Sequence, residues 1–312
     1  MLRILICGLV AAATLAYADD PEQHIHKVVK ATNATQLYVE VDSGAIHVHP
    51  GSSGSAEVEV TFRGGRSRAD LDTLMKYYDL DVELQGTDVR VRGKFREGHK
   101  PWQNDAFSLI AWIFGDTNAV RQIEYDITVP SHVGASLHTA GGSIEAEGLM
   151  RNVTANTSGG SIHLWNISGT ADVNTSGGSI TMDQIGGFVI AHTSGGAIRL
   201  HDLAAGVDAS TSGGSVTAAF LDQPARGCRL TTSGGSINIG LGQSVHMDIN
   251  ASASGGRVST DFNLPIDRHR PNELRAALNG GGPELYLHTS GGGIRIFHGE
   301  PAGAGHARNS AN

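Results

Sequence analysis

Two pairs of histidines at alternate positions are the first candidates for chemistry in this chain. His24 and His26 form one pair, and His47 and His49 form the other. Each pair projects from one face if the segment is a strand. Imidazoles at this spacing can bind a metal ion, but a metal site also needs a third ligand and groups that orient it. The chain has 15 histidines, so we expect these pairs to face solvent, and we predict neither a metal nor a cofactor.

Two carboxylates flank an aromatic residue at a regular interval. Glu147, Trp165 and Asp183 follow one another at steps of 18 residues. A sugar ring could lie on such a surface, and two carboxylates could in principle cleave a glycosidic bond. If the residues stand on stacked strands, the carboxylates are about 9–10 Å apart, at the wide end even for an inverting pair. The sequence also lacks the nucleophile-elbow, P-loop, zinc-protease and dinucleotide motifs.

These steps belong to a repeat that dominates the chain. The phrase Thr-Ser-Gly-Gly-Ser-Ile returns between His138 and Phe297, and the glycine pairs are separated by 18, 18, 18, 18, 21, 21 and 36 residues. Apolar and polar residues alternate on both sides of each pair, as in half-buried strands. Repeats of fixed short period form solenoids, in which each unit buries its apolar face against its neighbours. We expect the glycine pairs to supply the positive φ of a tight corner.

The sequence therefore predicts an all-β fold, a single-stranded parallel β-solenoid of 18-residue coils with an N-terminal β-rich cap and a short helix. Residues in one column stand about 4.8 Å apart on neighbouring strands. One outward column contains His138, Asn156, Asn174, His192, Ser210 and Thr231, and His288 lies near its far end. A second outward column contains Glu147, Trp165, Asp183 and His201. Such polar columns can bind a ligand or only keep the face soluble.

The repeated units, with Gln36–Val48 and Ile127–Pro130 before the first coil, resemble a known family. This is the bacterial "putative adhesin" family, a domain of unknown function with T-S-G-G-S-I coils. The resemblance covers about residues 36–297. It implies a β-solenoid and a role in adhesion or binding, and it supplies no catalytic residues.

The rest of the chain divides around the repeat. Residues 1–18 have the charged start, short apolar core and Ala16-Tyr17-Ala18 end of a secretory signal peptide. We expect residues 19–130 to form the cap, with a helix over 67–78 and an apolar insertion over 94–120. The solenoid follows over 131–298, with a second helical segment at 271–278, and 299–312 form a disordered tail.

The composition and the predicted signal peptide limit the classes of function that the chain can have. The chain has 312 residues and a net charge of −8, which does not favour nucleic-acid binding. No segment after the signal peptide is long and apolar enough to span a membrane. We predict an exported, periplasmic or surface protein that is not an enzyme and that binds or scaffolds in the cell envelope. Its partner would be an envelope protein or a surface glycan. A carbohydrate-active enzyme and an envelope-stress protein that acts through a protein partner are the alternatives.

Two sets of residues are the candidates for binding. For a ligand on the coil faces, the candidates are Trp165, Glu147, Asp183, His163, His192 and His201. For docking of a protein partner through the insertion, they are Trp112, Ile113 and Phe114.

Overall fold

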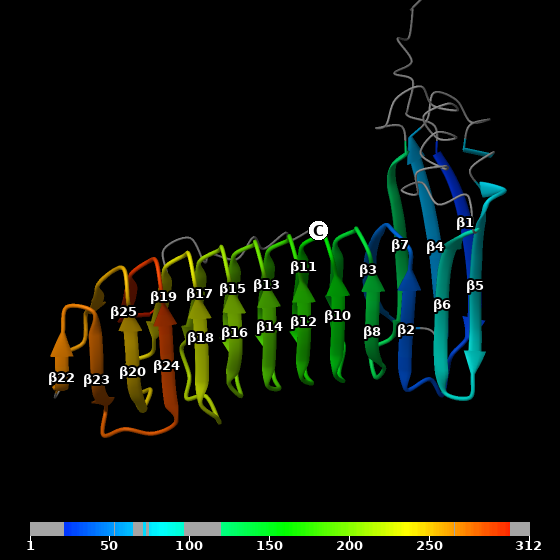
Figure 1. Ribbon diagram of the computed structural model, residues 1–312. Helices are drawn as coiled ribbons and strands as arrows, with labels where there is room; N and C mark the ends of the chain where they lie inside the picture. Colours follow the sequence, from blue (N-terminus) through cyan, green and yellow to red (C-terminus); the bar gives the residue numbers. More distant parts are fainter. Residues whose placement is uncertain are drawn as a thin grey trace, which may run out of the picture.

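The protein is a rod of two β-sheets that face each other across one hydrophobic core (Figure 1). This computed structural model describes residues 22–52, 54–64, 71–72, 75–96, 120–264 and 266–299. Within them, sheet A contains 12 strands and sheet B contains 13. The expected all-β fold is confirmed.

Each central coil gives one strand to each sheet, and equivalent strands pair in parallel with their neighbours. In sheet B these strands are β8 (Gly134–Thr139), β10 (Val153–Thr157), β12 (Ala171–Thr175), β14 (Val189–Thr193), β16 (Val207–Thr211) and β18 (Cys228–Thr232). In sheet A they are β9 (Ile144–Glu147), β11 (Ile162–Ile167), β13 (Ile180–Ile185), β15 (Ile198–Leu203), β17 (Val216–Phe220) and β19 (Ile237–Leu241). Their alternate residues are buried, so the period-2 pattern places the core as expected.

The glycine pairs serve a different purpose from the one expected. None of them has a positive φ, so our prediction of a left-handed corner is wrong. The second glycine of each pair instead lies directly against the coil before it. A Cβ on Gly178 would stand 1.9 Å from the carbonyl oxygen of Gly160, whereas a Cβ on Gly177 would be 3.5 Å from that of Gly159. In this pair only the second position excludes every side chain.

Positive φ occurs at the corner on the other side of the coil. Gly148, Asn166, Gln184 and Asp202 occupy this position in successive coils, with φ between 50° and 64°. Glycine, asparagine and aspartate tolerate the left-handed region better than other residues. The sequence period marks this corner only weakly, because no single residue type recurs there.

In seven of the described coils a threonine hydroxyl joins the coil to its neighbour, and Ala253 takes this position in the coil of Gly255 and Gly256. The Thr175 Oγ1 donates to the carbonyl of Gly160 at 2.9 Å and accepts from the backbone N–H of Gly178 at 3.3 Å. Thr139, Thr157, Thr193, Thr211, Thr232 and Thr289 make the equivalent contacts. All of these threonines are buried. We call this repeated arrangement the threonine–glycine clamp.

The N-terminal end of the rod is assembled out of sequence order. Its strands are β1 (Glu22–Lys30), β2 (Gln36–Val41), β3 (Ala45–Gly51), β4 (Ser55–Gly64), β5 (Tyr78–Gln85), β6 (Asp88–Phe95) and β7 (Val120–Pro130). The first coil, β2–β3, lies between the β6–β7 coil and the β8–β9 coil. Antiparallel pairing of β4 on β7, of β1 on β4 and of β5 on β6 covers this end.

The C-terminal end is threaded in a similar way. Its strands are β20 (Met247–Ala253), β21 (Val258–Thr260), β22 (Ile266–Arg270), β23 (Glu273–Leu278), β24 (Glu284–Thr289) and β25 (Ile294–His298). The last coil, β24–β25, inserts between the β18–β19 coil and the β20–β21 coil. At both ends, therefore, the coils do not stack in the order of the sequence, since the chain passes a neighbour and returns.

Two helical expectations need correction. Residues 271–278 do not form a helix, because Leu274, Ala276 and Leu278 alternate as buried residues of the strand β23. In the expected helix over 67–78, Leu71, Asp72 and Met75 have helical backbone. Tyr78 instead opens β5, where its ring packs edge-on against Phe62 at 5.0 Å and Phe95 at 5.1 Å.

Several other expectations lie outside the described residues. These are the signal peptide 1–18, the body of the apolar insertion, and all of the tail except Gly299. The insertion is shorter than expected, because β6 continues to Phe95 and β7 begins at Val120.

Substitution of each glycine of one pair tests whether close stacking between coils requires the second glycine. We expect Gly178→Ala to lower the free energy of unfolding by about 3 kcal/mol, because its Cβ overlaps a backbone carbonyl. Gly177→Ala should change it by less than about 1 kcal/mol, because its Cβ meets only ordinary contacts. Urea unfolding of both variants measures the difference. Equal destabilisation by the two substitutions would show that close stacking is not the reason for the second glycine.

The reactivity of Cys228 tests which of the alternating residues on β18 face the core. Its side chain is 3% exposed, and burial raises the pKa of the thiol to about 12. We expect iodoacetamide to leave Cys228 unmodified in the folded chain without residues 1–18, and to modify it fully in denaturant. Rapid labelling of the folded protein, followed by mass spectrometry, would place this residue on the outer face instead.

Candidate functional site

The outward face of sheet B carries a straight line of polar side chains. His138, Asn156, Asn174, His192 and Ser210 are register partners on β8, β10, β12, β14 and β16. We call these five residues the polar ladder. Pairing continues the line through Thr231 and His288. Parallel pairing in exact register sets neighbouring members one strand spacing apart, about 4.8 Å.

Hydrogen bonds along the ladder hold several of its side chains. The Asn174 Nδ2 donates to the Asn156 Oδ1 at 3.3 Å and to the Asp172 Oδ1 at 3.2 Å. The Nδ1 of His192 and the Oγ of Ser210 are 2.6 Å apart. Amides, imidazoles and hydroxyls each have more hydrogen-bonding capacity than these contacts use. The remaining capacity faces outward.

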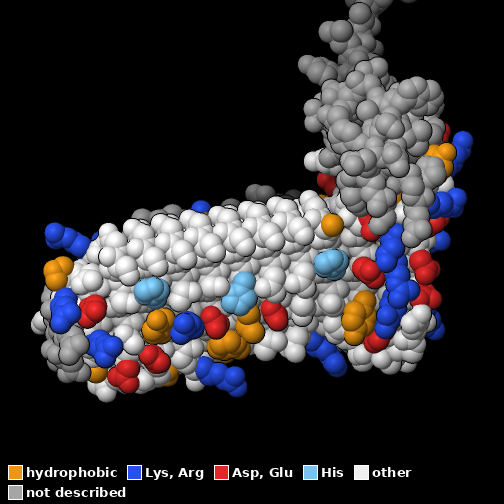
Figure 2. All heavy atoms as spheres, viewed as in Figure 1, with side chains coloured by type: hydrophobic (Ala, Val, Ile, Leu, Met, Phe, Trp, Pro, Cys, Tyr) orange, Lys and Arg blue, Asp and Glu red, His pale blue; other side chains and the backbone are white. Residues whose placement is uncertain are grey.

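The ladder forms one wall of an open groove of about 480 Å³. The other wall is the row of turn serines Ser158, Ser176, Ser194 and Ser212, and the buried coil threonines lie at its base. Figure 2 shows histidine side chains spaced along this face, with charged side chains at both ends of the rod and along its lower edge. The groove is therefore long, polar and free of charged side chains in its lining.

The six predicted ligand-binding residues are divided between the two sheets. Glu147, Trp165, Asp183 and His201 are register partners in sheet A, and His163 stands beside them on β11. His192 lies in sheet B, so the fold does not bring it near the other five. Alternation of the two strands in every coil causes this division, so the two outward columns expected from the sequence lie on opposite sheets.

The sheet A column is tied to the first coil by an imidazole–carboxylate contact. The Nδ1 of His49 is 2.9 Å from the Glu147 Oε1, and its Nε2 is 3.7 Å from the Asp126 Oδ1. The Trp165 side chain separates Glu147 from Asp183 along the column and is 39% exposed. Glu147 is thus engaged within the protein, and its position does not resemble that of an acid poised to protonate a leaving group.

The histidine pairs form contacts with carboxylates on neighbouring strands. The Nδ1 of His47 is 3.4 Å from Glu145, which also lies 4.0 Å from His163. Among the described residues, no group of three or more His, Cys, Asp or Glu side chains has the arrangement of a metal site. Trp112, Ile113 and Phe114, the predicted docking residues, lie outside the described ranges.

The fold and the repeat agree with a known family. Toastrack DUF4097 matches residues 108–296. The chain belongs to the Toastrack DUF4097 family. No curated protein matches it, and no helix in the described ranges has the length and apolar character of a membrane span.

Three solved structures are similar to the chain. A putative adhesin from Bacteroides fragilis is 14% identical, with a TM-score of 0.49 over 88% of this chain and 97% of that one. A putative adhesin from Parabacteroides distasonis is 11% identical, with a TM-score of 0.42 over 88% and 97%. A putative lipid binding protein from the same species is 16% identical, with a TM-score of 0.43 over 89% and 98%.

A second pocket on this face is not predicted by the sequence. Beside the groove, Tyr38, Glu40, Arg90 and Arg92 line this second pocket with Ser136 and His138. The alternation Arg90, Arg92, Lys94 is visible in the sequence, but the pairing of β6 with β2 places it next to Tyr38. This pairing reverses the order of the coils, so spacing could not reveal it.

Ladder residues should be replaceable without loss of the fold. We expect Asn174→Ala to lower the free energy of unfolding by about 1 kcal/mol or less, because its hydrogen bonds are half-exposed. Thr175→Val, one residue away, should cost about 2 kcal/mol, because it leaves the buried Gly160 carbonyl without its hydroxyl donor. Thermal unfolding of the two variants makes the comparison. A larger loss for Asn174→Ala would mean that the ladder is structural.

Proposed function

We propose that this toastrack protein is an exported, non-enzymatic binding module of the cell envelope, and that it holds an extended glycan along the sheet B groove. One observation carries the proposal: five consecutive coils align side chains that can both donate and accept hydrogen bonds along a groove. Sugar hydroxyls also donate and accept. A repeating ligand can meet this repeating surface at many equivalent points.

The character of the lining favours a glycan over a protein segment. Protein interfaces are usually centred on buried aromatic or aliphatic anchors. The groove offers instead hydroxyls, amides and imidazoles in a line. Many weak polar contacts along a flat face suit adhesion, since the contacts add up when the ligand spans several coils.

Two features support a binding role over glycan cleavage. The Glu147 carboxylate is held by His49, and Trp165 stands between it and Asp183. Export rests on the signal-peptide pattern of residues 1–18.

Affinity electrophoresis tests the proposal. The protein without residues 1–18 is run through gels that contain polysaccharide extracted from bacterial envelopes. We expect the polysaccharide to retard it, and we expect an Asn156→Ala, Asn174→Ala double variant to weaken binding about tenfold or more, because two ladder amides are lost.

Trp165→Ala is the matched control, since it removes a large exposed side chain from the opposite sheet. It should be retarded like the unchanged protein. Loss of retardation in Trp165→Ala alone would move the site to sheet A, as the sequence suggested. Absence of retardation in every gel, with a protein captured instead by in-cell cross-linking, would contradict the glycan proposal.

A further inference from the structure

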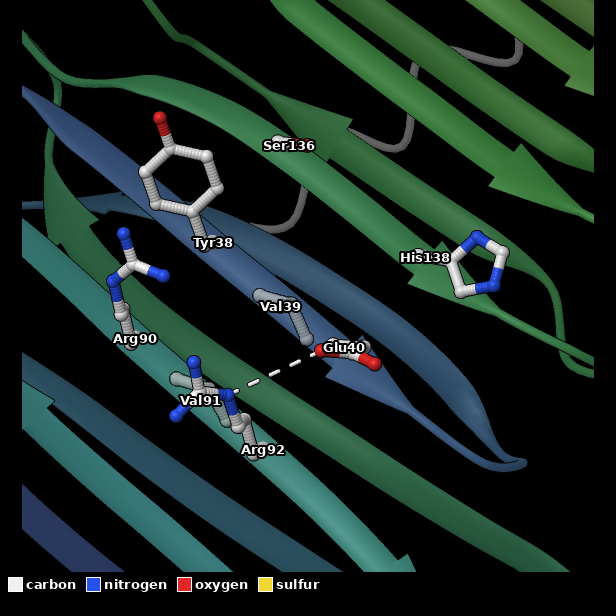
Figure 3. Close-up of a pocket in the computed structure, with 8 residues that line it drawn as sticks. All are labelled: Tyr38, Val39, Glu40, Arg90, Val91, Arg92, Ser136 and His138. Carbon is white, nitrogen blue, oxygen red and sulfur yellow. Dashed lines mark ion pairs between the residues drawn. The ribbon is translucent and has the colours of Figure 1, made fainter.

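The second pocket on sheet B continues the polar groove. It has a volume of about 300 Å³ and is lined by residues of β2, β6 and β8. His138 lines both the pocket and the groove. Figure 3 shows the side chains of Tyr38, Arg90 and Arg92 on neighbouring strands of this pocket, with His138 on the side of the groove. Toward the N-terminal end the ladder column continues from His138 to Glu40 in this pocket, and Arg90 lies in the column beside it, in line with Tyr38 and Ser136.

Of the two arginines that line the pocket, Arg90 has fewer carboxylate partners within the protein. Its guanidinium carbon lies 5.0 Å from the centre of the Tyr38 ring. Its Nε has no hydrogen-bond partner in the described part of the chain. The contact of its Nη2 with the Asp88 Oδ2 is 3.8 Å, longer than a hydrogen bond. Packing against the ring, not hydrogen bonding, holds this guanidinium in place.

The neighbouring charges are engaged with one another. The Lys94 Nζ donates to Glu40 at 2.9 Å, and this hydrogen bond lowers the pKa of the Glu40 carboxyl. Arg92 lies 4.0 Å from Glu40 and 3.6 Å from Glu83. Glu83 is the register partner of Arg90 across β5 and β6, yet the Glu83 ion pair is with Arg92. Arg90 pairs with one carboxylate, that of Asp88 at 3.8 Å, whereas Arg92 pairs with two. Its guanidinium fork therefore keeps donor capacity for an anionic oxygen pair.

The groove beyond the pocket does not favour further negative charge. Asp172 and Asp208 stand on the same face in the column beside the ladder, and the whole chain carries a net charge of −8. An anion on every sugar would meet these carboxylates. A chain with one anionic sugar followed by neutral sugars would not.

We infer that the ligand of the groove is an acidic glycan in which one anionic sugar binds at Arg90 and the adjoining neutral sugars follow the polar ladder. This inference rests on the proposed function and specifies its ligand. Ser136 and His138 supply the polar contacts between the two parts. The anionic group is a carboxylate or a sulfate, since both match the guanidinium fork.

A second arginine on the same face provides a matched control. Arg229 lies over the ring of Tyr286 at 4.4 Å, and the two are register partners, as Arg90 and Tyr38 are. Arg229 does not line the pocket or the groove. Arg229→Gln therefore removes an equivalent arginine–tyrosine contact without touching the proposed site.

The test is a glycan array with four kinds of chain. These are neutral oligosaccharides, the same oligosaccharides capped by one glucuronate or sialate, the same capped by one sulfated sugar, and polyuronates. We expect the capped chains to bind about tenfold or more tightly than the neutral chains, because a charge-assisted hydrogen bond is added. Polyuronates should bind more weakly than the capped chains. Arg90→Gln should reduce capped chains to the level of neutral ones, whereas Arg229→Gln should not.

Arg90→Lys provides a second variant, which keeps the charge and removes the fork, and it should retain part of the preference. Equal binding of capped and neutral chains, or an unchanged preference in Arg90→Gln, would overturn the anionic subsite and leave the glycan-binding proposal standing. Binding of no chain at all would overturn both. Melting curves of each variant confirm that binding is compared between folded proteins.

Discussion

The threonine–glycine clamp is the interaction on which the rest of the rod depends. A buried hydroxyl such as that of Thr175 accepts from its own turn and donates to the turn of the coil before it. The donated bond reaches its target because the second glycine has no side chain, so the two backbones meet. The clamp explains why Thr-Ser-Gly-Gly recurs as a unit, because the threonine and the second glycine form one contact. In the β20–β21 coil at the end of the stack, Ala253 stands in place of the threonine.

A fixed register at every turn has a consequence for the outer faces. Because neighbouring coils pair in the same register, the outward side chains at equivalent positions of successive coils form a straight line. The polar ladder and its serine-walled groove follow directly from this geometry. The surface needs no moving part to bind a repeating ligand. Its specificity would come from the ends of the line, where the repeat stops and a residue such as Arg90 can differ.

The sequence predicts the central coils and the polar ladder, but it does not predict the arrangement of the two ends of the rod. The 18-residue period and strict alternation gave the buried columns and the outward line from His138 to Ser210, since neighbouring coils are one period apart. The same period gave the wrong reason for the glycine pairs, because close approach and positive φ both select glycine. It separated His192 and Trp165 into two columns without showing that these columns lie on different sheets. It could not place Arg90 beside Tyr38, since that pairing depends on how the N-terminal end is threaded. Residues 271–278 were misassigned because a six-residue alternating strand and a short amphipathic helix look alike.

The central claim is that the sheet B face is the binding face. Backbone amide NMR of the protein, titrated with the polysaccharide that retards it in gels, tests this most directly. The account predicts chemical-shift changes along β8, β10, β12, β14 and β16 and at Arg90, with the strands that carry Glu147, Trp165 and Asp183 unchanged. Changes centred on Trp165 in sheet A, with the ladder unaffected, would contradict it.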